Sequence, residues 1–289
     1  IFKKKILNKE KINIWINSTV NKFKVQNSKL KYLNAISSDG SKIQIKSKKF
    51  IFCTGAIETT RLLLLLDKQN NKIISKTTNV LGRYFSDHIS IPIAVINKPS
   101  LKKLNLLFSY DFNNGIKKMR IGLKNNSSLR KRYPPFFINI PISVDNDRTY
   151  KSFRRLFQSF QKNKFPRFKD LIILIKNFKW ILKSLWWRFI KKKLLVSKKL
   201  KYRLDLIVEQ TPKFSNKITL SSKLDYLGSN IPIITWDLDK KDFNNIKNIK
   251  NEIKSFWQNS LLKNYGDLEF YSDKKILKKL KTYGGIHHP

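Results

Sequence analysis

A short apolar run that leads into a turn of very small residues limits the possible folds of this chain more than any other stretch. Phe50 to Cys53 has the pattern of a buried strand. Thr54-Gly55-Ala56 follows as a turn, and Glu58 to Leu66 predicts a leucine-rich helix with an acid in its first turn. In α/β folds, a strand, a small-residue turn and a helix in this order bring backbone close to a cofactor. A core strand followed by a buried helix, with no ligand, has the same pattern.

Extended segments are predicted before this stretch. Residues 12–16 alternate in polarity, and residues 17–25 continue as a second extended piece. Residues 30–37 and 41–47 alternate on either side of Ser38-Asp39-Gly40. Asp-Gly between two alternating segments predicts a β-hairpin.

Alternating and apolar segments continue far beyond the helix and predict an antiparallel sheet. They are residues 89–97, 104–112, 116–123, 136–144, 202–210, 218–220 and 231–236. Pro92 lies inside the first of them, which indicates an edge strand or a bulge. Asn113-Asn114-Gly115 predicts a tight turn between the second and the third. An apolar stripe along residues 242–264 predicts an amphipathic helix.

Residues 147–200 differ from their surroundings because they are helical in pattern, basic and aromatic. Within them, residues 168–195 carry Leu, Ile, Phe and Trp near helical spacing, with Lys and Arg in between. A helix of this kind can lie on a membrane surface. Two other interpretations stay open: an insertion that packs on its own domain with solvated charges, and a contact with a partner subunit.

The formal net charge of +42 comes from 61 Lys and Arg residues against 19 Asp and Glu residues. Such an excess is typical of proteins that bind nucleic acid or an anionic membrane. However, Lys is abundant together with Asn and Ile, which are all encoded by A- and T-rich codons, and it is spread along the whole chain. A compositional origin of the charge is therefore favoured, and no specific nucleic-acid partner is expected.

The few cysteines and histidines limit the possible metal chemistry. Cys53 is the only cysteine, which excludes an internal disulfide and a Cys-based metal site, and its apolar run predicts a packed, unreactive thiol. The histidines are His88, His287 and His288. Adjacent residues of an extended chain point to opposite sides, and no Cys, Asp or Glu cluster stands near His287 and His288. No metal site is therefore expected.

The strand, turn and helix resemble a segment of the glucose–methanol–choline (GMC) family of flavoprotein oxidoreductases. Residues 53–64, C-T-G-A-I-E-T-T-R-L-L-L, are similar to the family's A-G-A-I-E-T-P-R-L-L-L, which lies close to FAD. Thr60 stands where the family usually has Pro, a mild departure because Pro in the first turn of a helix is only a favourable option.

Three further blocks follow in the order of the family. Residues 81–88, L-G-R-Y-F-S-D-H, resemble V-G-R-x-x-x-D-H. Residues 209–220, which contain E-Q-T-P and N-K-I-T-L, resemble E-Q-x-P-N-x-S-R-V-T-L. Asp225, Gly228, Trp236 and Asp242 match the D-x-x-G, Trp and Asp that come next. Four blocks in order are stronger support than any one of them alone.

The resemblance implies a fold of mixed class, α/β plus α+β. Residues 1–96 would form part of an FAD/NAD(P)-binding domain. Residues 97–282 would form an antiparallel-sheet substrate-binding domain with residues 147–200 as a helical insertion, and residues 283–289 would return to the FAD-binding domain. Members of the family open with a G-x-G-x-x-G turn that holds the ADP part of FAD, and this chain has no such motif. The chain is thus expected to be a fragment that also lacks the extreme C-terminus and that binds FAD weakly or not at all by itself.

The resemblance also implies which residues contact FAD. Thr54, Gly55 and Ala56 would lie at the cofactor, and the backbone of Val20 would lie against its adenine. His88 ends the D-H pair that closes the link toward the substrate domain. A structural role near the cofactor is expected for this histidine.

A catalytic histidine is implied at the end of the chain. The family carries H-P-x-G-T or H-x-x-G-T there, and His288-Pro289 fits the first two positions, with His287 as the alternative. The implied reaction oxidises an alcohol, such as a sugar or a polyol. The imidazole accepts the hydroxyl proton and the carbinol carbon delivers hydride to flavin N5. The electron acceptor stays unknown. The alternatives are a basic module that binds nucleic acid or an anionic membrane surface, and an inactive remnant.

Overall fold

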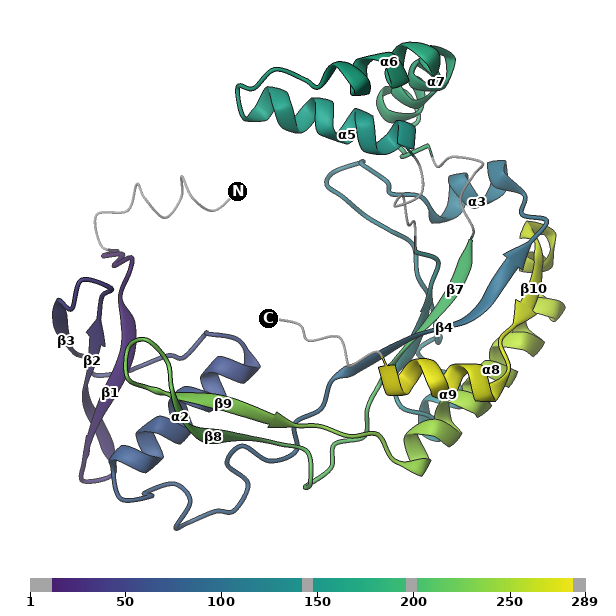
Figure 1. Cartoon of the computed structure of the whole chain (residues 1–289). Helices are drawn as coiled ribbons and strands as arrows, with labels where there is room; N and C mark the ends of the chain where they lie inside the picture. The colour runs from purple at the N-terminus through teal and green to yellow at the C-terminus, as the bar shows by residue number, and fades with distance from the viewer. Residues whose placement is uncertain (1–11, 142–147, 196–201, 283–289) are drawn as a thin grey trace. The chain divides into compact units, whose positions relative to one another are not determined.

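The computed structural model describes residues 12–141, 148–195 and 202–282, which combine helices with antiparallel sheets (Figure 1). Contacts divide the chain into two compact units. The first unit takes in Ile1–Ser86 and Pro212–Asp237, and the second takes in Asp87–Thr211 and Leu238–Ile286.

This division differs from the predicted domain ranges in two ways. The predicted boundary at residue 96 falls inside β4 (His88–Asn97), a continuous strand of the second unit. Residues 212–237 were expected in the second domain but cluster with the first unit. The first unit is thus assembled from two stretches that are more than a hundred residues apart in the sequence.

The first unit contains a three-stranded antiparallel sheet, a helix and a separate hairpin. The sheet has the order β1 (Thr19–Gln26), β2 (Lys29–Ile36) and β3 (Lys42–Lys46). The predicted turn at Gly40 is confirmed, with a φ of 85° at this residue. The helix is α2 (Ala56–Gln69), and the hairpin pairs β8 (Lys217–Leu224) with β9 (Asn230–Thr235).

The core of the first unit lies between α2 and the sheet. Its buried residues come from one face of the helix and from β1 and β2: Phe23, Leu33, Leu62, Leu65 and Leu66. The predicted helix over residues 58–66 is confirmed by α2. Its leucines recur at helical spacing, which puts the buried ones on one face. Burial of each such side chain contributes roughly 1.5–3 kcal/mol.

Two predicted strands of the first unit are wrong. Residues 50–53 adopt no strand, Ile51 is 86% exposed and Cys53 is exposed, so the prediction of a packed thiol is also wrong. Residues 12–16 are extended without strand pairing, and all of them are exposed. An apolar run forms a strand only when another edge pairs with it, and the described part of the first unit pairs no strand with either run.

The second unit is built on a five-stranded antiparallel sheet. Its strands follow the order β10 (Asp267–Phe270), β4, β7 (Arg203–Glu209), β6 (Phe136–Asn139) and β5 (Ile121–Gly122). The register of β4 against β7 shifts between Pro92 and Ala94, which confirms the predicted irregularity at this proline.

Helices pack against this sheet. They are α3 (Leu101–Phe108), α8 (Lys240–Asn259) and α9 (Asp273–Thr282), joined by the short helix η1 (Leu261–Tyr265). The predicted helix over residues 242–264 is thus α8 followed by η1. The alternate residues Leu204, Leu206 and Val208 of β7 are buried in the core with Ile246 and Ile249 of α8.

Between β4 and β7 the structure differs from several predicted strands. Residues 104–112 were expected as a strand, but α3 covers most of them, because Leu104 and Phe108 are one helical turn apart and both are buried. Of the strands predicted over residues 116–123 and 136–144, the described residues contain β5 and β6, with the one-turn helix α4 (Leu129–Arg132) between them. Residues 142–144 lie outside the described residues.

The predicted helical insertion contains three helices: α5 (Arg148–Gln161), α6 (Phe168–Lys176) and α7 (Phe178–Phe189). The single helix predicted over residues 168–195 breaks at Asn177, whose side-chain amide donates to the carbonyl oxygen of Ile173 at 2.8 Å. Within the described ranges, no helix has both the length and the apolar character needed to cross a bilayer.

Candidate functional site

The small-residue turn lies at the N-terminus of α2. Gly55 precedes the helix with φ 80° and ψ 162°, a conformation that L-residues rarely adopt. Its carbonyl oxygen accepts the N–H of Thr59 at 2.9 Å, and the hydroxyl groups of Thr54 and Thr59 lie 2.9 Å apart. Thr54 and Ala56 are exposed and Gly55 is half-buried. The turn therefore presents backbone with few side-chain atoms over it.

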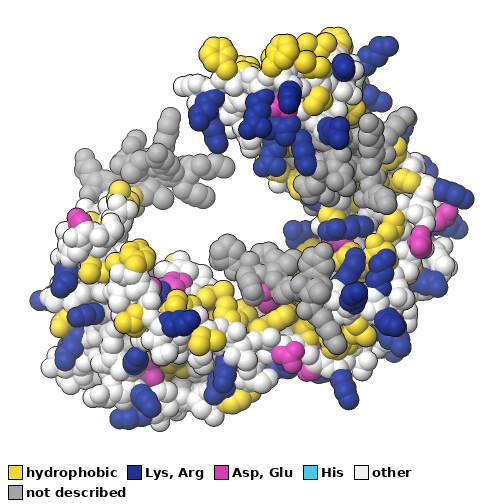
Figure 2. Space-filling model, in the orientation of Figure 1, with side chains coloured by type: hydrophobic (Ala, Val, Ile, Leu, Met, Phe, Trp, Pro, Cys, Tyr) yellow, Lys and Arg dark blue, Asp and Glu magenta, His cyan; other side chains and the backbone are white. Residues whose placement is uncertain are grey.

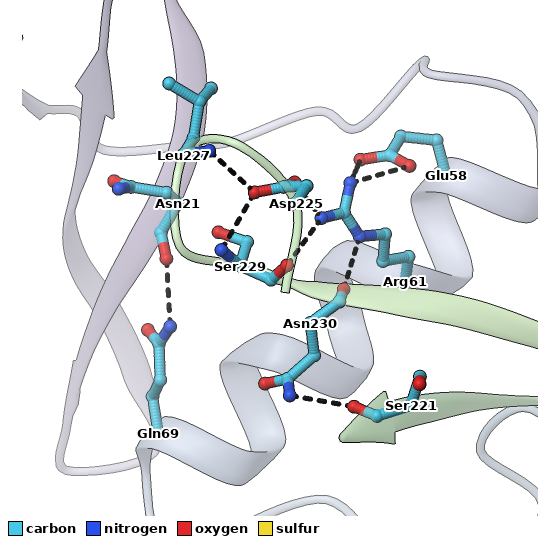
Figure 3. A network of polar contacts seen from close by, with 9 residues as sticks. All are labelled: Asn21, Glu58, Arg61, Gln69, Ser221, Asp225, Leu227, Ser229 and Asn230. Carbon is cyan, nitrogen blue, oxygen red and sulfur yellow. Dashed lines mark hydrogen bonds and ion pairs between the residues drawn. The ribbon is translucent and has the colours of Figure 1, made fainter. Parts of the chain in front are cut away.

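One buried arginine fixes the first half of α2 to the β8–β9 hairpin (Figure 3). The guanidinium of Arg61 forms ion pairs with Asp225 and with Glu58, the latter at 3.1 Å. Its Nε also donates to the carbonyl oxygen of Asn230 at 2.8 Å. Burial would lower the pKa of Arg61, but Asp225 and Glu58 together raise it above its ordinary value.

Asp225 joins the same network to the loop between β8 and β9. Its Oδ1 accepts the N–H groups of Leu227 at 3.0 Å and of Ser229 at 2.9 Å (Figure 3). Burial would raise the pKa of Asp225, but these N–H groups and Arg61 hold it below the usual 3.8. The loop is therefore ordered by a carboxylate that stays ionised.

The last turn of α2 is held by a second set of polar contacts. The side-chain amide of Gln69 donates to the carbonyl oxygen of Asn21 at 2.9 Å (Figure 3). Its oxygen accepts the N–H of Phe23 at 2.9 Å. The side-chain oxygen of Asn70 accepts the N–H of Val25 at 2.9 Å. The helix behind the turn is thus bound at one end to β1 and at the other to the β8–β9 hairpin.

The stability of the first unit is expected to fall in acid through Asp225. Its pKa is lower in the folded state than in the unfolded chain, so its contribution is present above the unfolded pKa and is lost as the pH falls through the folded value. Urea titrations between about pH 5 and pH 2 should show this loss. Asp225→Asn should be less stable at neutral pH and less sensitive to acid. A variant with the same acid sensitivity as the parent would contradict this assignment.

A close backbone contact joins two further segments of the first unit. The N–H of Ile218 donates to the carbonyl oxygen of Gly82 at 2.7 Å, and the N–H of Phe85 donates to that of Asn216 at 3.1 Å. Gly82 has a φ of 75°. A Cβ at this position would lie 2.3 Å from the carbonyl oxygen of Ile218. Only glycine fits here.

The face of the second unit's sheet that is turned away from Leu204, Leu206 and Val208 carries polar side chains beside the paired Ile207 and Phe137. His88 pairs with Glu209 across β4 and β7, and Asn139 pairs with Asp205 across β6 and β7. Their side chains alternate with those of the core, so all four lie on this face. The Nε2 of His88 is 4.0 Å from the Oε1 of Glu209. We call the surface formed by these four residues and Arg203 the polar sheet face.

Asp205 is the most buried ionisable group of the polar sheet face. Burial raises its pKa, although Arg203, Lys279 and Lys118 act against that rise. The Nε of Arg203 lies 2.9 Å from its Oδ1. Burial also lowers the pKa of Lys118. Among the described residues, the buried Oδ1 of Asn139 has no hydrogen-bond partner.

The structure places the predicted cofactor residues in both units. Thr54, Gly55 and Ala56 form the turn of the first unit. Val20 is half-buried in β1, where its side chain packs against the core under α2. His88 begins β4 in the second unit. The predicted catalytic residues His288 and His287 lie outside the described residues.

Two features of the site were missed from the sequence. Arg61 lies among leucines on α2, and an arginine in an apolar helix face usually has a buried acidic partner. Asp205 lies in an alternating strand with apolar neighbours, which was a similar signal. In the part of the chain that the structure describes, no group of three or more His, Cys, Asp or Glu residues is arranged to hold a metal ion.

Comparison with known proteins gives a distant structural likeness. No family model and no curated protein matches the chain. Among solved structures, it is similar to a formate oxidase from Aspergillus oryzae, studied for the effect of a mutation on the modification of its FAD. The TM-score is 0.47 at 12% sequence identity, and the match covers 95% of this chain and 50% of the oxidase. The chain thus spans half the length of that enzyme, and a likeness this distant leaves its activity to be inferred from its own residues.

Proposed function

We propose that the chain is part of an FAD-dependent oxidoreductase that acts on an alcohol. The observation that carries the proposal is that the segments resembling the GMC family meet in pairs. Arg61 of the first block contacts Asp225 of the last, 164 residues away. Residues 82–85 form backbone hydrogen bonds with residues 216–218. The N–H of Gln210 donates to the carbonyl oxygen of Asp87 at 3.3 Å. Chance similarities would have no reason to lie side by side.

The turn before α2 fits an approaching cofactor. Gly55 and Ala56 leave the backbone uncovered, and Thr54 adds one hydroxyl group. These three residues would hold part of FAD, which supplies the hydride acceptor when it is bound. The network of Arg61 keeps the turn in place because it fixes the helix behind it.

The polar sheet face is the proposed binding region for the substrate. Asp205 and Glu209 supply acceptors, and Arg203 supplies donors. This mixture suits hydroxyl groups, which both donate and accept. The role of proton acceptor stays with His288, or with His287 as the alternative.

The proposal is tested by the flavin content of the protein made from the complete gene, which contains this chain with whatever is encoded on either side. The parent protein is expected to carry FAD. Ala56→Glu places a carboxylate at the turn, at a helix N-terminus where an acid does not destabilise the fold. We expect this variant to lose flavin affinity by about tenfold or more, a loss comparable to that of a well-placed contact.

Gln44→Glu is the matched control, because it makes the same change of charge at an exposed position of β3 in the same unit. It should keep its flavin. A parent protein without flavin would contradict the proposed function and would favour an inactive remnant. Full flavin content in Ala56→Glu would contradict only the role of the turn.

A nucleic-acid-binding module is the less favoured alternative. Figure 2 shows Lys and Arg side chains on all parts of the face in view. A compositional origin of the charge accounts for such a spread.

A further inference from the structure

Helices α6 and α7 carry a continuous stripe of exposed apolar side chains. On α6 the stripe contains Phe168, Ile172 and Ile175. On α7 it continues through Phe178, Leu182, Trp186 and Phe189. Successive members are three or four residues apart, so each helix presents them on one face. Figure 2 shows hydrophobic side chains gathered along the outer edge of this part of the molecule.

The stripe is not the buried side of these helices, because their other side is already packed. Asp170 of α6 is 3% exposed, and its Oδ1 accepts the hydroxyl of Ser152 on α5 at 2.7 Å. The Nε of Arg155 donates to the Oδ2 of Asp170 at 3.0 Å. Leu174 and Trp187 are buried on the same side. The three helices thus have an interior of their own, and the stripe lies outside it.

The charges around the stripe are almost all positive. Residues 148–195 contain fifteen Lys and Arg residues and one acid, Asp170. Arg155 holds the pKa of that acid below its usual value, so Asp170 remains ionised and paired between α5 and α6. The surface of this part of the chain therefore presents cations without acids. A partner that covers it has to be anionic.

A pocket of about 180 Å³ lies between α5 and the loop before α6. Lys162, Lys164 and Arg167 of the loop line it together with the ion pair of Arg155 and Asp170. Phe165, in the same loop, is 99% exposed. The loop thus repeats the pattern of α6 and α7, with cations next to a solvent-exposed aromatic ring.

We propose that α6, α7 and the loop before them bind the surface of a membrane that contains anionic lipids. Aliphatic and aromatic side chains in a stripe gain by entering the acyl boundary, while the flanking Lys and Arg side chains pair with lipid phosphates. Nucleic acid offers no apolar phase for Ile172, Ile175 and Leu182. A second copy of the chain would bring a second cationic surface against the first.

The test is sedimentation of the full chain with vesicles at physiological salt. The vesicles contain phosphatidylcholine alone or with about a third phosphatidylglycerol. We expect binding to the anionic vesicles only. Replacing Ile175, Leu182 and Phe189 by serine should weaken this binding by about tenfold or more, because the apolar contribution is lost. All three side chains are exposed, so the fold should stay intact in circular dichroism.

Matched variants separate binding through the stripe from nonspecific adsorption by exposed apolar or charged residues elsewhere in the chain. Ile51, Ile116 and Leu261 are even more exposed elsewhere in the chain, and their triple replacement by serine should leave vesicle binding unchanged. Lys179→Glu with Lys183→Glu should weaken binding far more than Lys22→Glu with Lys24→Glu, which makes the same change of net charge.

Three results would overturn the proposal. The first is equal binding of the parent and the serine variant of the stripe. The second is equal binding of the two charge variants. The third is binding to duplex DNA that matches vesicle binding in strength and is lost in the same stripe variant. None of these results depends on whether the protein carries flavin.

Discussion

Replacing Arg61 by leucine is expected to lower the free energy of unfolding by about 3 kcal/mol, near the lower end of the range for breaking a buried ion pair. The arginine side chain is 11% exposed and that of Asp225 is 19% exposed, so the variant leaves a carboxylate with little access to water. Asp225 keeps its bonds from Leu227 and Ser229, which limits the loss. The helix also loses its link to Asn230.

Urea unfolding followed by circular dichroism measures this loss. Lys68→Leu is the control on the same helix, because Lys68 is exposed and makes one bond, to the side chain of Asn230 at 2.9 Å. It should cost less than about 1 kcal/mol. The double variant Arg61→Leu, Asp225→Leu should recover part of the stability, since it leaves no carboxylate unpaired. Equal losses for Arg61→Leu and Lys68→Leu would show that the ion pair does not hold the helix.

Gly82→Ala is expected to cost at least about 3 kcal/mol. The positive φ of this residue accounts for about 1–2 kcal/mol of strain in any L-residue. The new Cβ would meet the carbonyl oxygen of Ile218 at 2.3 Å, so the two segments must move apart and lose the hydrogen bond that joins them. That bond adds roughly 1 kcal/mol.

Gly40→Ala separates the two contributions. Gly40 has a φ of 85°, but nothing lies within 4 Å of a Cβ placed there. Its replacement should cost only the conformational strain, about 1–2 kcal/mol. Thermal and urea unfolding of both variants measure the difference. Similar losses at the two glycines would mean that residues 82 and 218 are not in close backbone contact.

Much of the local structure was predictable because it depends on neighbours in the sequence. The leucine spacing of α2, the Asp-Gly turn at residue 40 and the alternation of β7 are such features. The apolar run at residues 50–53 failed as a strand because hydrophobicity alone does not show whether an edge is available to pair with it. The sequence of α3 predicts a strand, because short apolar segments fit both the strand and the helix period.

The candidate site was predictable only in part, for a related reason. The turn at residues 54–56 is visible in the sequence because small residues precede a helix there. The ion pair of Arg61 joins residues that are 164 positions apart, and no local pattern shows that distance. The polar sheet face depends on the register of three strands, which puts Asn139 beside Asp205. A shift of the strand register by one residue would point either side chain into the core.

The contact between Arg61 and Asp225 also sets an order of events during synthesis. A ribosome adds about 5–20 residues per second, so roughly 10 to 30 s pass between the emergence of the arginine and that of its partner. Through that interval α2 has β1 and β2 to pack on but lacks the β8–β9 hairpin. The intervening strands of the second unit emerge in the meantime with exposed edges. A nascent chain of this design therefore depends on chaperones or fast translation more than one whose units are each continuous in sequence.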